Sequence, residues 1–156
     1  MAKDPFAIFE AQHEEGLKQL NHLEGAVERL RASGASPELL EAIRGAAAFI
    51  NREVRVHNQK EEELLFPPLE GVLPPGGPTA VMRDEHRALW SALGRLEEAI
   101  SWLAGGNEAA RVEVINSARF IVELLRAHIR KENEVLYPMA RRLLSREKIE
   151  GMAQRM

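Results

Sequence analysis

The stretch VHNQKEEELLFPP, residues 56–68, carries a histidine, a glutamate four residues later and an aromatic–proline pair. The stretch AHIRKENEVLYPM, residues 127–139, carries the same residue types at the same spacing. Residues four apart lie on one face of an α-helix, one turn along. The repeat therefore predicts two helices that each present an imidazole beside a carboxylate. The two pairs are His57 with Glu61 and His128 with Glu132.

Two further histidines extend this repeat through the whole chain. The four repeated histidines are His13, His57, His86 and His128. The first and third are 73 residues apart, and the second and fourth are 71 apart. Apolar residues recur at matching offsets, as with Leu20 and Leu93, so each histidine lies on the apolar stripe of its helix. The pattern predicts two similar helical hairpins, about residues 4–70 and 78–144, with four histidines facing one core.

Helix start and stop signals define the elements. The expected long helices cover about residues 5–30, 37–66, 78–103 and 107–144. Asp4-Pro5 and Ser36-Pro37 each combine a capping residue with proline at the first helical position. Pro67-Pro68 is expected to end the second helix, and Tyr137-Pro138 to kink or end the fourth. Ser145 is placed to cap a short C-terminal tail helix. The sequence thus predicts an all-α fold, an up-down-up-down four-helix bundle with a tail helix.

Composition limits the class of protein. At 156 residues, with 45% hydrophobic and 29% charged residues, the chain is expected to form a single domain over residues 1–156. A formal net charge of −3 gives no basic field for nucleic acid. The absence of cysteine excludes disulfides and thiolate metal sites. No apolar run is long enough for a membrane helix or a signal peptide, so we expect a cytoplasmic protein.

The inward polar residues predict a metal site. The six candidate ligands are His13, His57, Glu61, His86, His128 and Glu132. Such a mixed nitrogen and oxygen set suits a hard or borderline divalent metal. Six side chains are too many for one tetrahedral zinc, but they fit two metals about 3.5–4 Å apart, with the glutamates bridging. Glu53, one turn before His57, is a further candidate, either to accept a hydrogen bond from a ligand imidazole or to line a path for protons and metal. The alternative is that Glu53 lies at the edge of the apolar stripe with its carboxylate in water.

The other neighbours of the repeated residues are expected to have no direct role. Glu85 and Asp84, beside His86, are expected to be exposed, because adjacent helix positions diverge by about 100°. The run KEEE, residues 60–63, is expected to be a solvated face with only Glu61 turned inward. Three aromatic residues are expected to pack above or beside the site: Trp90, Phe66 and Tyr137.

The pattern QHEEGL, HNQKEEELLFP, DEHRAL and HIRKENEVLYP resembles the hemerythrin-like (HHE cation-binding) family over about residues 8–140. The resemblance implies a non-haem di-iron centre, two iron ions with a bridging oxo or hydroxo group, held by the four histidines with Glu61 and Glu132 as bridges. Oxygen-carrying members have a fifth histidine four residues from another on the third helix, where this chain has Met82 and Trp90. His22 is expected to point outward. These departures weaken reversible oxygen storage as the function.

Several functions stay open at this point. The first is a di-iron protein that binds, senses or reacts with a small ligand, namely oxygen, nitric oxide or peroxide. The second is an iron-binding or iron-donating module for iron homeostasis or iron–sulfur repair, without turnover. The third is a bundle that holds zinc or manganese or serves as a scaffold. The pattern does not decide whether the centre is an enzyme, and it identifies no protein partner. No nucleophilic triad or phosphate-binding loop is recognisable.

Overall fold

The structure, a computed structural model, describes residues 3–156 and is built from helices, with no strand in that range. The elements in chain order are α1 (Pro5–Ser33), α2 (Pro37–Phe49), η1 (Ile50–Val54), α3 (Arg55–Lys60), η2 (Glu61–Leu65), α4 (Phe66–Glu70), α5 (Pro78–Ala104), η3 (Glu108–Ala110), α6 (Arg111–Lys131), η4 (Glu132–Leu136), α7 (Tyr137–Leu143) and α8 (Arg146–Arg155). The predicted all-α class is confirmed. Within residues 3–156, no helix is both long and apolar enough to cross a membrane.

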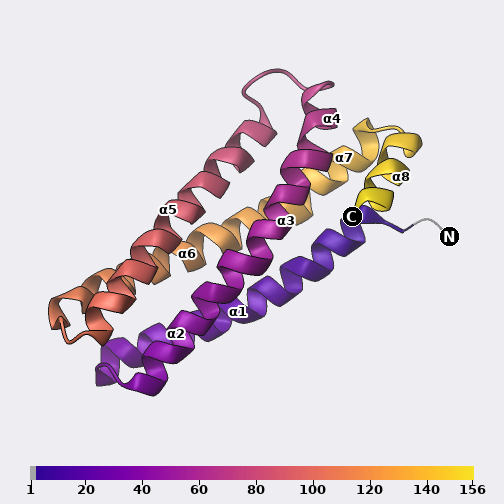
Figure 1. Ribbon diagram of the computed structural model, residues 1–156. Helices are drawn as coiled ribbons and strands as arrows, with labels where there is room; N and C mark the ends of the chain where they lie inside the picture. Colours follow the sequence, from indigo (N-terminus) through magenta and orange to yellow (C-terminus); the bar gives the residue numbers. More distant parts are fainter. Residues whose placement is uncertain (1–2) are drawn as a thin grey trace.

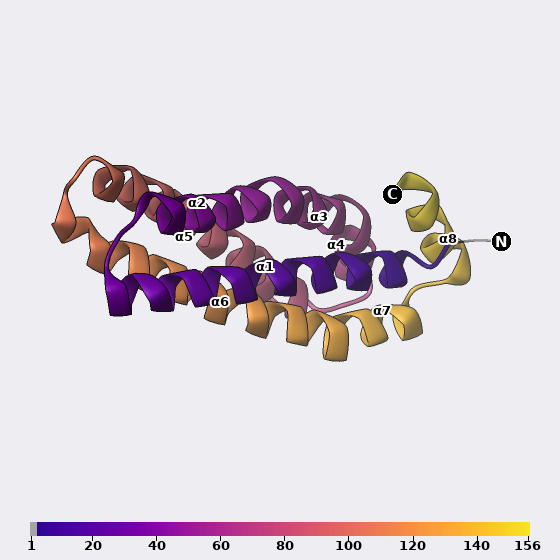
Figure 2. The ribbon, with the colours of Figure 1, turned by 90° about the horizontal axis from the view of Figure 1, so that it is seen from below.

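The long helical segments lie side by side along one axis (Figures 1 and 2). Residues 37–70, from α2 to α4, form one continuous rod, and so do residues 111–143, from α6 to α7. α1 packs against α2 and α6, and α5 packs against α6 and α2. α8 folds back across the end of the bundle where α1 begins (Figure 1). Each rod therefore has neighbours on two sides, and its apolar stripe is enclosed.

The capping residues act as the sequence predicts. The Asp4 side chain accepts a hydrogen bond from the Phe6 amide, and Ser36 accepts one from the Leu39 amide at 3.1 Å. Ser145 caps the tail helix α8 through the Lys148 amide. Each cap satisfies a backbone N–H that has no partner within its own helix. At the other end of α1, Gly34 takes a φ of 82°, which glycine adopts without a steric cost.

The expected stop at Pro67-Pro68 is wrong, because the helix continues through both prolines to Glu70. The preceding turn, η2, is a π-helix, and the matching turn η4 precedes Pro138 in the second half. Proline in a regular helix lacks the N–H donor and clashes with the carbonyl four residues earlier. A π-helical turn contains one residue more than an α-helical turn, and this changes which carbonyl faces the proline. The helix therefore continues through the proline.

Two apolar clusters fill the core, with a polar layer between them. The larger cluster occupies the end near the α1–α2 and α5–α6 connections and includes Leu30, Ile43 and Leu96. The smaller cluster lies at the other end, where Phe6, Phe9, Leu65 and Tyr137 pack, and Met152 brings α8 onto it. Along each rod the repeated histidine lies between residues of the two clusters. The four histidines therefore lie at one level of the bundle, closed off from solvent at both ends.

Candidate metal centre

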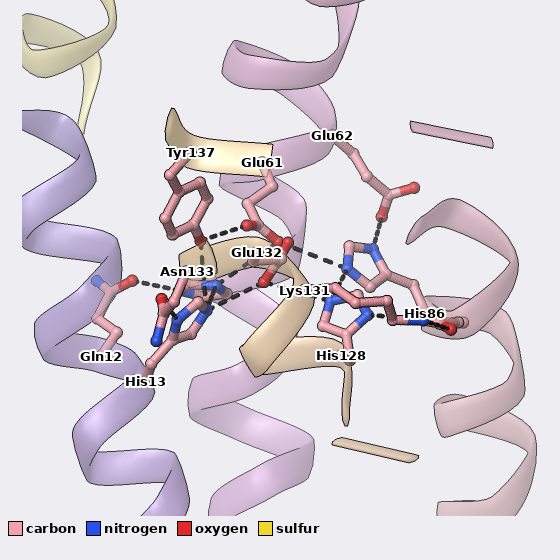
Figure 3. Close-up of polar contacts among 12 residues, drawn as sticks. Gln12, His13, Glu61, Glu62, His86, His128, Lys131, Glu132, Asn133 and Tyr137 are labelled. Atoms are coloured by element: carbon pink, nitrogen blue, oxygen red, sulfur yellow. Dashed lines mark hydrogen bonds and ion pairs between the residues drawn. The ribbon is translucent and has the colours of Figure 1, made fainter. Parts of the chain in front are cut away.

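The structure brings all six predicted ligands into the polar layer. Figure 3 labels all of them except His57. The four histidines are at most 5% exposed, and both glutamates are fully buried. They form two overlapping groups of potential ligand atoms that share both glutamates. The first position consists of His13 and His57 with Glu61 and Glu132, and the second consists of His86 and His128 with the same glutamates.

Each glutamate reaches one histidine of each position. Glu132 Oε1 lies 3.0 Å from His13 Nε2 and 3.3 Å from His128 Nε2. Glu61 Oε1 lies 3.6 Å from His57 Nε2 and 3.5 Å from His86 Nε2. Both carboxylates therefore lie between the two positions, where a ligand that bridges two cations must lie. The widened turns η2 and η4 begin at these same glutamates, which places irregular helix geometry at the candidate site.

Facing nitrogen atoms complete each position. His13 Nε2 lies 3.1 Å from His57 Nε2, and His86 Nε2 lies 3.2 Å from His128 Nε2. One carboxylate oxygen of each glutamate, Oε1 of Glu61 and Oε2 of Glu132, is buried with no hydrogen-bond partner among the described residues. A buried carboxylate oxygen without a partner is costly. Converging nitrogen lone pairs and orphaned carboxylate oxygens together fit cation coordination.

The buried charges also set the proton affinities of the site. Burial alone would lower the pKa of the His128 imidazole, but the negative charge of Glu132 raises that pKa to about 10. Burial also acts to lower the pKa of His13, but its hydrogen bond to Glu132 and the negative charges of Glu132 and Glu61 together raise that pKa. Burial opposes ionisation of Glu61, yet the neighbouring His57 holds the pKa of this carboxyl well below its usual range. The carboxylates thus favour positive charge on the facing imidazoles, supplied by protons or by cations.

The outer ring nitrogen of each histidine is also hydrogen-bonded. The contacts are His13 Nδ1 to Asn133 Oδ1 at 2.8 Å, His57 Nδ1 to Gln12 Oε1 at 2.6 Å, His86 Nδ1 to Glu62 Oε2 at 3.3 Å, and His128 Nδ1 to Glu85 Oε1 at 2.9 Å. In each case the Nδ1–H donates, which directs the Nε2 lone pair toward the centre and fixes the ring. All four imidazoles are therefore oriented for Nε2 coordination.

Tyr137, expected mainly to pack beside the site, also makes a polar contact with it. Its hydroxyl donates to Glu61 Oε2 at 2.6 Å and lies 3.3 Å from His13 Nε2 (Figure 3). Its ring stacks on Phe9 and His13 with centroid distances of 5.6 and 5.5 Å. Burial raises the pKa of the Tyr137 phenol well above its usual value, so the hydroxyl stays protonated as a donor.

The structure places Glu53 away from the imidazole hydrogen bond considered for it. Gln12 occupies that position on His57, while the exposed Glu53 carboxylate accepts a hydrogen bond from Arg52 at 3.0 Å. Glu53 also lines a cavity whose wall includes His57, so its role along a path to the site stays a prediction.

Two expectations about neighbouring carboxylates are wrong. Glu85, expected to be exposed, and Glu62, expected to lie on a solvated face, are both hydrogen-bonded to buried histidines. The hydrogen bond from His128 holds the pKa of Glu85 at about 2. A signal was present in the sequence, because Glu85 directly precedes one repeated histidine and Glu62 directly follows one repeated glutamate. His22 is exposed as predicted, and Met82 is buried in the smaller apolar cluster.

A helical bundle with histidine and glutamate groups buried in its core defines a class of cation-binding protein. The chain belongs to the family described as the hemerythrin HHE cation-binding domain, whose profile matches residues 4–140. The resemblance inferred from the four motifs is thereby confirmed.

Two relatives show what the chain is similar to. The chain is similar to the iron-sulfur cluster repair protein YtfE of Escherichia coli O157:H7, with 27% identity over 136 residues, which is 85% of this chain and 61% of that protein. It is also similar to the protein of the same name from Yersinia pestis (strain Pestoides F), with 29% identity over 84% of this chain and 60% of that protein. The chain thus spans about three fifths of the length of these relatives.

Proposed function

We propose that this protein holds two iron ions in the polar layer and uses them to bind or react with a small ligand. The proposed nitrogen ligands are His13 and His57 for one ion and His86 and His128 for the other, with Glu61 and Glu132 bridging. The observation that carries the proposal is the grouping of four buried imidazoles around two buried glutamates, each with one carboxylate oxygen that has no hydrogen-bond partner among the described residues. Membership of a cation-binding family supports the same reading.

Bound iron would supply redox change and ligand exchange at the centre. The chain's own residues determine where that chemistry takes place. Phe9 packs edge-on against His57 and Phe66 stacks on His86, so apolar rings exclude water from the smaller-cluster side. The Tyr137 hydroxyl holds a proton beside the Glu61 carboxylate. A small ligand would therefore meet a site that is dry on this side, with one fixed proton donor near its edge.

A second candidate function is iron donation in iron–sulfur cluster repair. The observation that favours it is the similarity of the chain to two iron-sulfur cluster repair proteins. The ligands would be the same in both functions. The difference is whether iron stays in the centre during the reaction or leaves it.

We further propose that the chain forms one domain over residues 1–156, with its two halves arranged as helical hairpins in an up-down-up-down bundle. The sequence repeat supports this. In each half, the first helix supplies one histidine and the second helix supplies a histidine–glutamate pair. Each bridging glutamate then contacts both halves, which couples their folding to cation binding.

The test is iron content after anaerobic loading with ferrous iron, followed by absorption spectra with oxygen, nitric oxide and peroxide. We expect about two irons per chain and a spectrum that changes with at least one of these ligands. His13→Ala should lose bound iron. His22→Ala is the matched control, since it removes an exposed histidine from the same helix.

Less than one iron per chain, or unchanged binding in His13→Ala, would overturn the proposed centre. A loaded protein that ignores all three ligands but transfers iron to an apo iron–sulfur acceptor would favour the donor function instead.

A further inference from the structure

The two cation positions differ in the hydrogen bonds behind their imidazoles. At the first position, both outer nitrogens donate to neutral amides, His57 to Gln12 and His13 to Asn133. No carboxylate contacts either of these Nδ1 atoms among the described residues. The amide oxygens fix the rings without adding negative charge to them.

At the second position, both outer nitrogens donate to carboxylates, His86 to Glu62 and His128 to Glu85. A carboxylate partner draws the Nδ1 proton toward itself and makes Nε2 a more basic ligand than an amide partner does. The second position therefore offers a cation two strongly basic Nε2 ligands, whereas the first position offers two less basic ones.

The difference follows the sequence repeat. Gln12 and Glu85 are 73 residues apart and each directly precedes a repeated histidine. Asn133 and Glu62 are 71 residues apart and each directly follows a repeated glutamate. The repeat-related positions thus carry an amide in one half and an acid in the other, and the fold gathers both amides at one cation position and both acids at the other.

Cations next to the two acids reduce this difference but do not remove it. Lys131 donates to Glu85, and Arg83 lies 3.4 Å from Glu62. These contacts also hold each carboxylate in place against its histidine. The neutral amides of Gln12 and Asn133 have no charge to be offset.

An open cavity adjoins the first position and not the second. It has a volume of about 340 Å³ and its wall includes both His13 and His57, but neither His86 nor His128. Gly16 is part of this wall, and a Cβ added there would meet nothing within 4 Å. Asn58 also lines the cavity, and its buried amide nitrogen has no hydrogen-bond partner among the described residues. The cavity thus offers space beside the first position and a free polar group in its wall.

The cavity rim is close to neutral. Glu15 and Glu53 both lie there, but each is paired with an exposed cation, Lys18 and Arg52 respectively. The rim therefore presents no strong barrier to a cation or to a small chelating ligand.

We propose that the first position is an exchangeable iron site that fills and empties through this cavity, while the second position retains its iron. The inference rests on the proposed function, since it requires both positions to bind iron. It assigns different tasks to the two ions, one held as a fixed partner and one available for transfer or for binding of an external ligand.

The test is removal of iron from the doubly loaded protein by excess ferrous chelator, followed by absorbance under anaerobic conditions. We expect two phases of equal amplitude, with rates that differ by about 10- to 100-fold, the effect typical of hydrogen-bond partners behind metal ligands. A single phase that releases about two irons would overturn this inference and leave the proposed function standing. Failure to load iron would overturn the proposed function itself.

Exchanging the partners assigns the phases. Glu62→Gln with Glu85→Gln should accelerate the slow phase, and Gln12→Glu with Asn133→Asp should slow the fast phase. Glu63→Gln with Asp84→Asn is the matched control, because these exposed acids directly adjoin the partly buried Glu62 and Glu85. If neither pair of substitutions changes its rate, the hydrogen-bond partners are not the cause of the difference between the two positions, and the inference is overturned.

Filling the cavity tests the route. Gly16→Leu should slow the fast phase and leave the slow phase unchanged, because the larger side chain occupies the space beside His13. Gly25→Leu is the control, since it makes the same change on an exposed face of the same helix. A fast phase that Gly16→Leu leaves unchanged would show that iron leaves by another route.

Discussion

The hydroxyl of Tyr137 offers a single-atom test of the polar layer. Tyr137→Phe removes the hydrogen bond to Glu61 Oε2 but keeps the ring that packs on Phe6, Phe9 and His13. Phenylalanine is already present at the repeat-related position, where Phe66 stacks on His86. The substitution therefore isolates the hydrogen bond from the packing.

The expected loss follows from the burial of both partners. Tyr137 and Glu61 are each fully buried, so water cannot replace the lost donor. A hydrogen bond to a charged group contributes about 1.5–3 kcal/mol, and its removal leaves the carboxylate oxygen unpaired. For a chain of this size, that loss lowers the melting temperature by about 3–12 °C.

The assay is urea unfolding of the metal-free protein, followed by far-ultraviolet circular dichroism. A loss below about 0.5 kcal/mol, the range of surface substitutions, would refute the buried hydrogen bond. A changed dependence of the unfolding free energy on urea would point to a changed unfolded state instead.

Four further predictions concern a helix cap, the core and the charges of His128 and Glu85. Ser36→Ala removes the cap of α2 and should cost about 1 kcal/mol in urea unfolding; an unchanged midpoint would contradict the cap. Leu96→Ala, in the larger apolar cluster, should cost about 2–5 kcal/mol while leaving iron content unchanged, and loss of iron would show that the cluster and the centre are coupled. The His128 pKa of about 10 lies above its ordinary 6.5, so its stabilisation of the metal-free protein is complete below 6.5 and lost as pH rises toward 10. The Glu85 pKa of about 2 lies below its ordinary 4.5, so its stabilisation is present above 4.5 and lost as pH falls toward 2, and Glu85→Gln should flatten this acid limb of melting temperature against pH.

The sequence alone determined which residue types meet in the core. The helical period places a histidine and a glutamate four residues apart on one face, and the repeat doubles that arrangement. These relations are local to one helix, so they needed no knowledge of how the helices pack. The caps at Asp4 and Ser36 were predictable for the same reason, since a cap bonds to the first turn of its own helix.

The prediction of helix ends failed where a proline follows a π-helical turn. The prolines after Phe66 were read as a stop, but a widened turn ahead of them lets the helix continue. The helical period does not predict that turn, although it recurs at the same place in both halves, beginning at Glu61 and at Glu132.

Only the tertiary structure decided which side chains contact the outer nitrogens. Adjacent helix positions diverge by about 100°, so Glu62 and Glu85 were expected to face solvent. In the bundle, Glu62 and Glu85 lie beside the buried face of their own helices and next to an imidazole of a neighbouring helix. Their long side chains reach the Nδ1 atoms of His86 and His128. These contacts depend on the rotation and spacing of neighbouring helices, and the period of a single helix predicts neither. For that reason the candidate ligands were visible in the sequence, whereas the different hydrogen-bond partners behind the two pairs of histidines appeared only once the helices were packed together.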